Sequence, residues 1–165
     1  MRLSALARYP APAGRVAEIL ADQSFIDAWL AGEPTFARSA SVAGTPPGAF
    51  TVSIRRRIPV GDLPPQLRQL MPRGLDVRQV NAWEAVGSDG VRRGTSAVDI
   101  LGAPVKLTGT MALVPKGDEE CEQRYAIDLQ ATVPMMGAKI EQAAAHVIQR
   151  ALDTEKAAML ARLNG

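Results

Sequence analysis

Residues 134–163 of this chain read PMMGAKIEQAAAHVIQRALDTEKAAMLARL. After the Pro-Met-Met-Gly turn, the 27 residues 138–164 contain neither proline nor glycine. At 1.5 Å per residue they would form a helix roughly 40 Å long. The apolar residues recur at the three-, four- and seven-residue spacing of an amphipathic helix, at Ile140, Ala144, Val147, Ile148, Ala151, Leu152, Ala158 and Met159. The stretch therefore predicts one long helix whose apolar face needs a partner.

The chain upstream of this helix consists mainly of short segments in which apolar and polar residues alternate, the pattern of β-strands. The predicted strands are Met1–Tyr9, Thr35–Val42, Ala49–Ile58, Leu75–Val86, Val91–Leu101, Val105–Val114 and Cys121–Thr132. Two short helices, Arg15–Ala21 and Ser24–Ala31, are predicted between the first two strands, with Asp22 as the N-cap of the second. The Pro-rich segment Pro59–Gly74 predicts one or two helical turns.

This order of elements predicts an α+β fold, because runs of strands followed by a helix are typical of an antiparallel sheet. None of the strands could bury the apolar face of the long helix alone. We therefore expect a curved antiparallel sheet wrapped around the C-terminal helix. The 165 residues contain no repeat and suit a single domain, residues 1–165.

Composition and charge argue against several classes of function. The net charge of +2 and the seven aromatic residues offer little to a nucleic acid, so no nucleic-acid partner is expected. The chain has no apolar run of 18 residues, so no stable membrane insertion is expected. The N-terminal residues lack the apolar segment of a signal peptide, which predicts a cytoplasmic protein.

The sequence also lacks the residues needed for a His/Cys metal site or for a His-activated nucleophile. One histidine and one cysteine cannot assemble a His/Cys zinc site, and a single cysteine cannot form an internal disulfide. His146 falls on the polar face of the predicted helix, which argues against a His-dependent nucleophile. We expect no cofactor, no metal and no catalytic residue.

Several local motifs resemble those of DUF2505, a family of uncharacterised actinobacterial proteins in the START/Bet v 1-like (SRPBCC) superfamily. The motifs are Val16–Asp22 before Phe25, Leu63–Leu67, Trp83 at the end of a strand, Gly102–Val105 and Val133–Glu141. The resemblance covers nearly the whole chain and implies the helix-grip fold, with a deep cavity between sheet and helix that often holds lipids or other hydrophobic molecules. It implies no particular reaction, and the fold alone does not fix the function.

Candidate ligand-binding residues follow from the faces of these elements. Strand alternation places Gln79 and Asn81 on the face of Trp83, and Arg56 on the face of Phe50, Val52 and Ile54. Polar groups on such a face need partners or a water-filled or ligand-filled space. Candidates on the helix are Ile140, Ala144, Val147, Ile148 and Ala151, with Glu141 at the border of the apolar stripe. Met71 and Met135, together with Met136, are predicted at the mouth.

Each of these candidates also has a structural interpretation. The polar residues could reach solvent at strand ends, and the alanines and methionines could serve close packing. Glu155, near the middle of the apolar stripe, is a candidate to pair with Arg56 or to hold the polar end of a ligand. Pro59–Gly74 is either a lid or a stiff loop. Arg55, Arg57, Arg78 and Arg92 predict a basic patch on the outer sheet face.

The function predicted first is therefore the binding of a hydrophobic small molecule or lipid between sheet and helix. The alternatives are a cyclase- or hydratase-like enzyme acting on a polyketide- or steroid-type ligand, and a protein-interaction module with a filled core. A carboxylate with a raised pKa beside the ligand would favour the enzyme. A missing or very small cavity would favour the interaction module.

Overall fold

The computed structural model describes residues 1–32 and 37–165. Within these ranges seven strands form one antiparallel sheet in the order β1-β7-β6-β5-β4-β3-β2. The elements are β1 (Arg2–Tyr9), α1 (Ala13–Leu20), α2 (Gln23–Ala31), β2 (Ala37–Gly44), β3 (Phe50–Ile58), η1 (Val60–Asp62), α3 (Pro65–Leu70), β4 (Leu75–Trp83), β5 (Arg92–Ile100), β6 (Val105–Pro115), β7 (Cys121–Ala131) and α4 (Gly137–Asn164).

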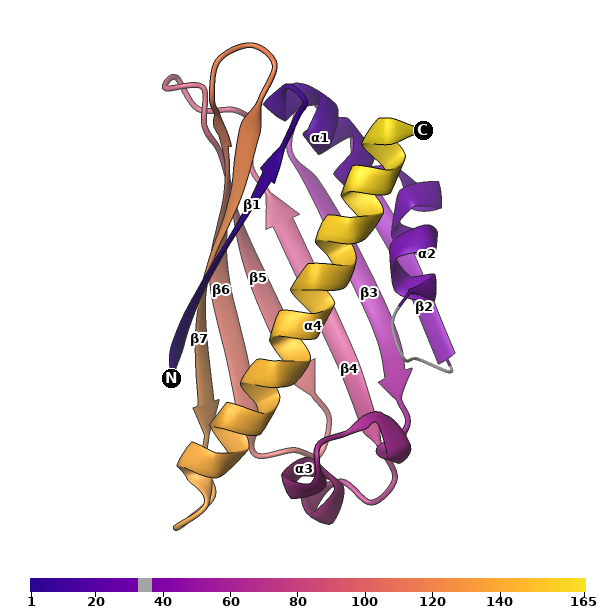
Figure 1. Ribbon diagram of the computed structural model, residues 1–165, viewed down its shortest axis with the longest axis vertical. Helices are drawn as coiled ribbons and strands as arrows, with labels where there is room; N and C mark the ends of the chain where they lie inside the picture. Colours follow the sequence, from indigo (N-terminus) through magenta and orange to yellow (C-terminus); the bar gives the residue numbers. More distant parts are fainter. Residues whose placement is uncertain (33–36) are drawn as a thin grey trace.

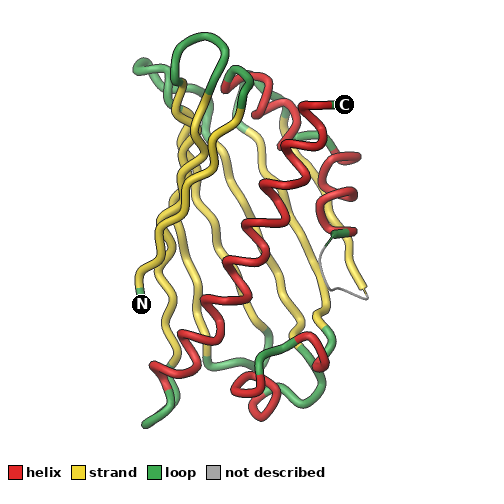
Figure 2. Tube along the Cα trace, in the orientation of Figure 1, coloured by secondary structure: helices red, strands yellow, loops and turns green. Residues whose placement is uncertain are grey.

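The predicted helix-grip arrangement is confirmed. The curved sheet holds α4 diagonally across one face, with α1 and α2 beside the C-terminal part of α4 and α3 near the opposite end (Figure 1). Figure 2 shows that the long strands run the length of the molecule on one side of this single long helix. The N-terminal strand β1 joins the sheet at its edge by pairing with β7, far away in the sequence.

Most predicted elements are present, with shifted ends. The first helix begins at Ala13, two residues before the prediction, with Pro12 as its N-cap. The carbonyl of Pro12 accepts the backbone N–H groups of Arg15 and Val16 and so starts the helix. The strand predicted to reach Val86 ends at Trp83. Thr35, the predicted first residue of another strand, lies outside the described residues.

The N-terminal end of α4 is packed and anchored. Ile140, Ala143 and Ala144 are buried against the sheet. The carboxylate of Glu141 accepts the backbone N–H of Ala131 at 3.1 Å and lies 3.4 Å from the amino group of Met1. The hydrogen bond from Ala131 is the main reason why the pKa of Glu141 is lowered. These contacts fix the beginning of α4 to the end of β7.

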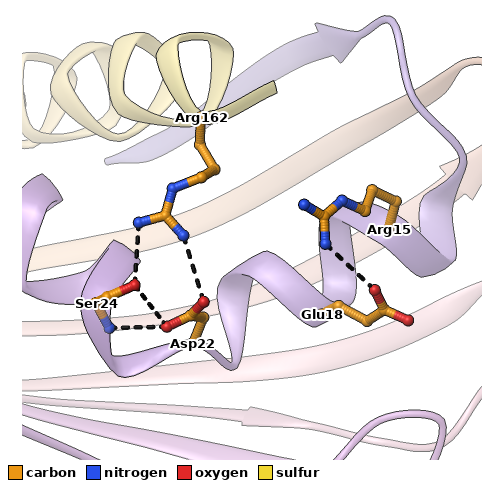
Figure 3. A network of polar contacts seen from close by, with 5 residues as sticks. All are labelled: Arg15, Glu18, Asp22, Ser24 and Arg162. Carbon is orange, nitrogen blue, oxygen red and sulfur yellow. Dashed lines mark hydrogen bonds and ion pairs between the residues drawn. The ribbon is translucent and has the colours of Figure 1, made fainter. Parts of the chain in front are cut away.

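The C-terminal end of α4 is fixed to α2. The side chain of Asp22 caps α2 by accepting the backbone N–H of Ser24 at 2.8 Å, as predicted. Arg162 donates to Asp22 at 3.3 Å and to the Ser24 hydroxyl at 3.1 Å (Figure 3). The Arg162 guanidinium also lies 5.8 Å from the centre of the Phe25 ring. Met159 is fully buried in the same core cluster as Phe25.

The predicted basic patch on the outer face is wrong for Arg92. This side chain is 3% exposed and lies on the inner face, in register with Leu113. Its guanidinium donates to the carbonyls of Glu84, Gly48 and Pro47 at 2.7–3.2 Å and stacks over the Phe50 ring. Arg92 therefore closes one end of the core instead of charging the outer surface.

Candidate ligand-binding cavity

A cavity of about 180 Å³ lies between the inner face of the sheet and the middle of α4. One water needs roughly 10–15 Å³ of such space, so the cavity has room for a molecule much larger than water. Its walls are mostly apolar and include Ile58, Leu75, Val77, Val98, Ile100, Leu107, Met111, Ile127, Val147, Ile148, Ala151 and Leu152.

The hollow arises where small residues meet. Ser96 and Gly109 are partners on neighbouring strands, in the same row of the sheet as Asn81. Above the sheet, α4 contributes Ala151 to the cavity wall. Small side chains from three elements thus coincide, and packing leaves a space that a row of larger residues would fill.

One wall carries a chain of polar side chains that spans β3, β4 and β5. Arg56 Nη2 donates to Gln79 Oε1 at 2.9 Å, and Gln79 Nε2 donates to Asn81 Oδ1 at 3.1 Å. The hydroxyl of Ser96 donates to the same Asn81 oxygen at 2.7 Å. All four residues line the cavity. The pleat accounts for this arrangement, since Gln79 and Asn81 lie two residues apart on β4 and share a face.

A second polar cluster, which we call the Glu155 cluster, comprises Glu155, Tyr125, Gln123 and Tyr9. Glu155 is 6% exposed and accepts the hydroxyl of Tyr125 at 2.7 Å and the amide of Gln123 at 3.1 Å. Gln123 also contacts the Tyr125 hydroxyl. Glu155 and Tyr125 line the cavity.

Burial and the charge of Glu155 control the tyrosines of this cluster. Burial raises the pKa of Tyr125 well above its ordinary value, and the neighbouring carboxylate raises it further. The pKa of Tyr9 is raised for the same two reasons, burial first. Both phenols therefore stay protonated to a more alkaline pH than an exposed tyrosine, and Tyr125 remains a donor to Glu155.

The cavity reaches the surface beside α4. Gly32 at the end of α2, Asp62 in η1 and Arg150 on α4 belong to its lining and are exposed. Trp29 lies in the wall on this side and is buried, and its indole Nε1 has no hydrogen-bond acceptor in the part of the chain that the structure describes. The exposed part of the lining beside α4 therefore comes from α2, η1 and α4, whereas the three methionines predicted at the mouth are not among the residues that line this cavity.

A smaller hollow of about 50 Å³ lies under α3. It is lined by Leu67, Leu70 and Met71, and it shares Leu75, Ile100, Leu107, Val147 and Ile148 with the main cavity. The two spaces are neighbours separated by these shared side chains. The Pro-rich segment thus forms one wall of the smaller hollow.

Most of the predicted site residues line one of these two spaces. Arg56, Gln79, Asn81, Val147 and Ile148 line the main cavity, and Met71 and Ala144 line the hollow under α3. Their role in binding remains a prediction.

The other four predicted residues do not line the main cavity. Trp83 faces inward as predicted, but it stacks on Phe50 with ring centres 6.3 Å apart and touches only a space of about 10 Å³. Ile140 is fully buried in the packed core, and Glu141 faces the end of β7. Met135 is fully exposed, with a positive φ of 66°. Packing and the turn before α4 remove these side chains from the space.

Sequence reasoning did not select Trp29, Ser96 or Tyr125. Tyr125 alternates with Ile127 and Leu129 on β7, so its inward direction was readable. Ser96 gave no signal of its own, because its role depends on its partners Asn81 and Gly109 across the sheet. Among residues 1–32 and 37–165, no group of three or more potential metal ligands is present. No helix in these ranges is long and apolar enough to cross a membrane.

The architecture is shared with solved structures of the START/Bet v 1-like class, so the protein has the helix-grip fold. A START superfamily protein from Mycobacterium smegmatis matches with a TM-score of 0.55 and 13% identity, covering 98% of each chain. TTHA0849 from Thermus thermophilus matches with a TM-score of 0.59 and 16% identity, covering 98% of this chain and 99% of its own. The Zhui aromatase/cyclase from a Streptomyces species matches with a TM-score of 0.61 and 14% identity, covering 98% of this chain and 92% of its own.

Sequence comparison identifies the family. The model of DUF2505, described as a protein of unknown function, matches residues 4–163, and the chain belongs to this family. No curated protein matches the chain in sequence. At these identities the solved structures establish the fold alone.

Proposed function

We propose that this protein binds a hydrophobic small molecule or lipid in the cavity between the sheet and α4. The observation that supports this most directly is the space of about 180 Å³ under the middle of α4, bounded mainly by apolar side chains. Concave, largely apolar sites with a few polar groups are typical of small-molecule binding. A protein-interaction module with a filled core does not account for such a space.

Affinity would come mainly from apolar burial. Each Å² of apolar surface removed from water contributes about 25 cal/mol, before the cost of immobilising the ligand is subtracted. Val147, Ile148 and Leu152 on α4 face Val77, Val98 and Leu107 on the sheet, so both sides of a flat or extended ligand would be covered.

Native mass spectrometry of the purified protein, followed by organic extraction, tests the proposal. An apolar metabolite released by extraction would establish the class of ligand. The neutral fluorescent probe N-phenylnaphthylamine supplies an independent test, because its emission rises in an apolar site. An apo mass combined with no probe binding would contradict the proposal.

A second candidate function is an enzyme of the cyclase or hydratase kind. It is favoured by the carboxylate of Glu155, which is buried, lines the cavity and holds the Tyr125 hydroxyl at 2.7 Å. A buried carboxylate beside a substrate can act as a general base. The solved structures that share the fold include aromatase/cyclases.

Proton exchange would reveal such a base without knowledge of the natural substrate. A methyl ketone incubated with the protein in deuterated water would exchange its α-hydrogens for deuterium, as followed by proton NMR. Exchange should disappear in Glu155→Gln and persist in Glu120→Gln, which changes an exposed carboxylate in the same way. If the wild type exchanges no faster than buffer, the enzymatic candidate is rejected for such ketones.

A further inference from the structure

The hydrogen bonds from Arg56 through Gln79 to Asn81 in the polar wall of the cavity run in one direction, from donor to acceptor, and Arg56 sets that direction. A guanidinium has only donors, so the side-chain atom of Gln79 that faces Arg56 Nη2 at 2.9 Å must be the amide oxygen. The amide nitrogen of Gln79 then points to Asn81, which must present its own oxygen at 3.1 Å. Rotating the side-chain amide of Gln79 or Asn81 by half a turn would place two N–H donors, or two oxygen acceptors, against each other. The chemistry thus fixes both amides.

The oxygen of Asn81 is fully used, whereas its nitrogen is not. Oδ1 accepts from Gln79 and from the Ser96 hydroxyl, one bond for each lone pair. Within the described residues, no hydrogen bond engages Asn81 Nδ2, which carries two N–H donors. Gln79 Nε2 retains a second N–H in the same way. Both side chains are half-buried and line the cavity, so this wall offers donors to its contents.

We infer that the bound molecule has an apolar body and at least one hydrogen-bond-accepting oxygen of the carbonyl type, as in a ketone or a carboxylate. This oxygen receives the N–H donors of Asn81 and Gln79. The inference rests on the proposed function and adds the polar chemistry of the ligand to it. A ligand whose polar group only donates, such as an alkylammonium ion, would place donor against donor at this wall.

Competition with N-phenylnaphthylamine tests this inference with four probes of similar apolar length. Methyl nonyl ketone and decanoate carry acceptor oxygens, undecane carries no polar group, and undecylammonium carries only donors. Each probe is titrated against wild-type protein and against Asn81→Asp. The substitution keeps an oxygen for Gln79 and Ser96 but replaces the free N–H donors by a second oxygen.

The inference predicts a selective change between wild type and Asn81→Asp. The affinity for ketone and decanoate should fall about tenfold or more, the affinity for undecane should stay the same, and that for undecylammonium should rise. Gln130→Glu likewise replaces an amide by a carboxylate, on the exposed outer face of β7, and should alter the affinity for none of the four probes. A side-chain amide spectrum of the wild type should show the Asn81 Nδ2 signal shifting with ketone but not with undecane, whether or not the variant folds.

The possible results separate the inference from the function on which it rests. If the probes bind but ketone and undecane lose affinity equally in Asn81→Asp, or if the Asn81 signal ignores the ketone, the acceptor oxygen is disproved and hydrophobic binding stands. If N-phenylnaphthylamine itself does not bind and no apolar probe changes the side-chain amide spectrum, the cavity is not a binding site and both proposals fall.

Discussion

The two ends of α4 pack against the protein core, whereas its middle lines the cavity. At the N-terminal end Ile140, Ala143 and Ala144 are buried, and at the C-terminal end Glu155 and Met159 are buried. Between them Val147, Ile148, Ala151 and Leu152 are only partly buried, because they face the cavity. The same helix is thus held firmly at both ends and is left unpacked in between. Stability and binding should therefore be assigned to different parts of one element.

The largest expected effect is on stability, at the N-terminal end. Ile140→Ala removes a fully buried side chain and should lower the free energy of unfolding by about 2–5 kcal/mol. Ile148→Ala removes the same atoms beside a space that already exists, so its cost should be clearly smaller. Urea denaturation of both variants measures the difference. Equal losses would show that the middle of α4 is as closely packed as its end.

The next largest effect concerns the Glu155 cluster under alkaline conditions. Tyr125 stays protonated in the folded state because its pKa is raised, whereas in the unfolded chain it ionises near its ordinary value of 10.0. The folded state then binds more protons, so stability falls as the pH rises above about 10, by about 1.4 kcal/mol per pH unit for this group. Tyr125→Phe should lose stability less steeply over this interval.

Absorbance provides a direct check of this prediction. The chain has two tyrosines, Tyr9 and Tyr125, and both have raised pKa values. The tyrosinate absorbance band should therefore appear only when circular dichroism shows that the protein unfolds. A band that develops near pH 10 in the folded protein would show that the cluster is open to water.

The middle of α4 should respond in binding more than in stability. Ala151→Leu adds three carbon atoms inside the cavity and should weaken the binding of N-phenylnaphthylamine about tenfold, with the free energy of unfolding unchanged or raised. Ala157→Leu makes the same change on the exposed face of α4 and should affect neither. Fluorescence titration and urea denaturation give the two values. Unchanged binding in Ala151→Leu would place the probe outside the cavity.

The contrast between packed and cavity-lining residues also explains which features the sequence could predict. Periodicity identified α4, the strands and the inward face, because it depends on the order of residues along one element. Trp83 was correctly predicted to face inward, but whether an inward residue meets a hollow depends on its neighbours. Trp83 meets the Phe50 ring, while Asn81 on the same strand lies in a row with Ser96 and Gly109.

The contacts of charged residues were hardest to predict for a related reason. The prediction placed Arg92 on the outer face because it assigned the alternation of β5 one residue out of step with the observed strand. A shift of one residue moves every side chain of a strand to the other face of the sheet. Glu155 was recognised near the middle of the apolar stripe of α4, yet its partners Tyr125 and Gln123 come from the strand β7, about 30 residues earlier in the sequence. The strand register determines where Arg92 points, and tertiary packing determines the partners of Glu155. Neither can be read from the residue pattern of a single sequence.

The smallest expected effect is at the C-terminal end of α4, where the contact between helices is exposed. The Ser24 hydroxyl and backbone N–H, followed by Arg162, lower the pKa of Asp22 below its ordinary value of 3.8. Because the folded pKa is depressed, this stabilisation is present above the ordinary pKa and is lost as the pH falls through the folded value. Since Asp22 is 46% exposed, the effect should be about 1 kcal/mol or less.

Asp22→Asn separates the cap from the charge. Asparagine still accepts the Ser24 N–H, so α2 should keep its cap, but the attraction to Arg162 is lost. The variant should therefore lose less stability than wild type between about pH 5 and 2, as followed by urea denaturation at each pH. Asp118→Asn removes the same charge from the exposed connection between β6 and β7 and serves as the control. If the Asp22 and Asp118 variants behave alike, the ion pair between Asp22 on the α2 cap and Arg162 on α4 contributes no pH-dependent stability, and the uncharged contacts around Met159 and Phe25 hold the C-terminal end of α4.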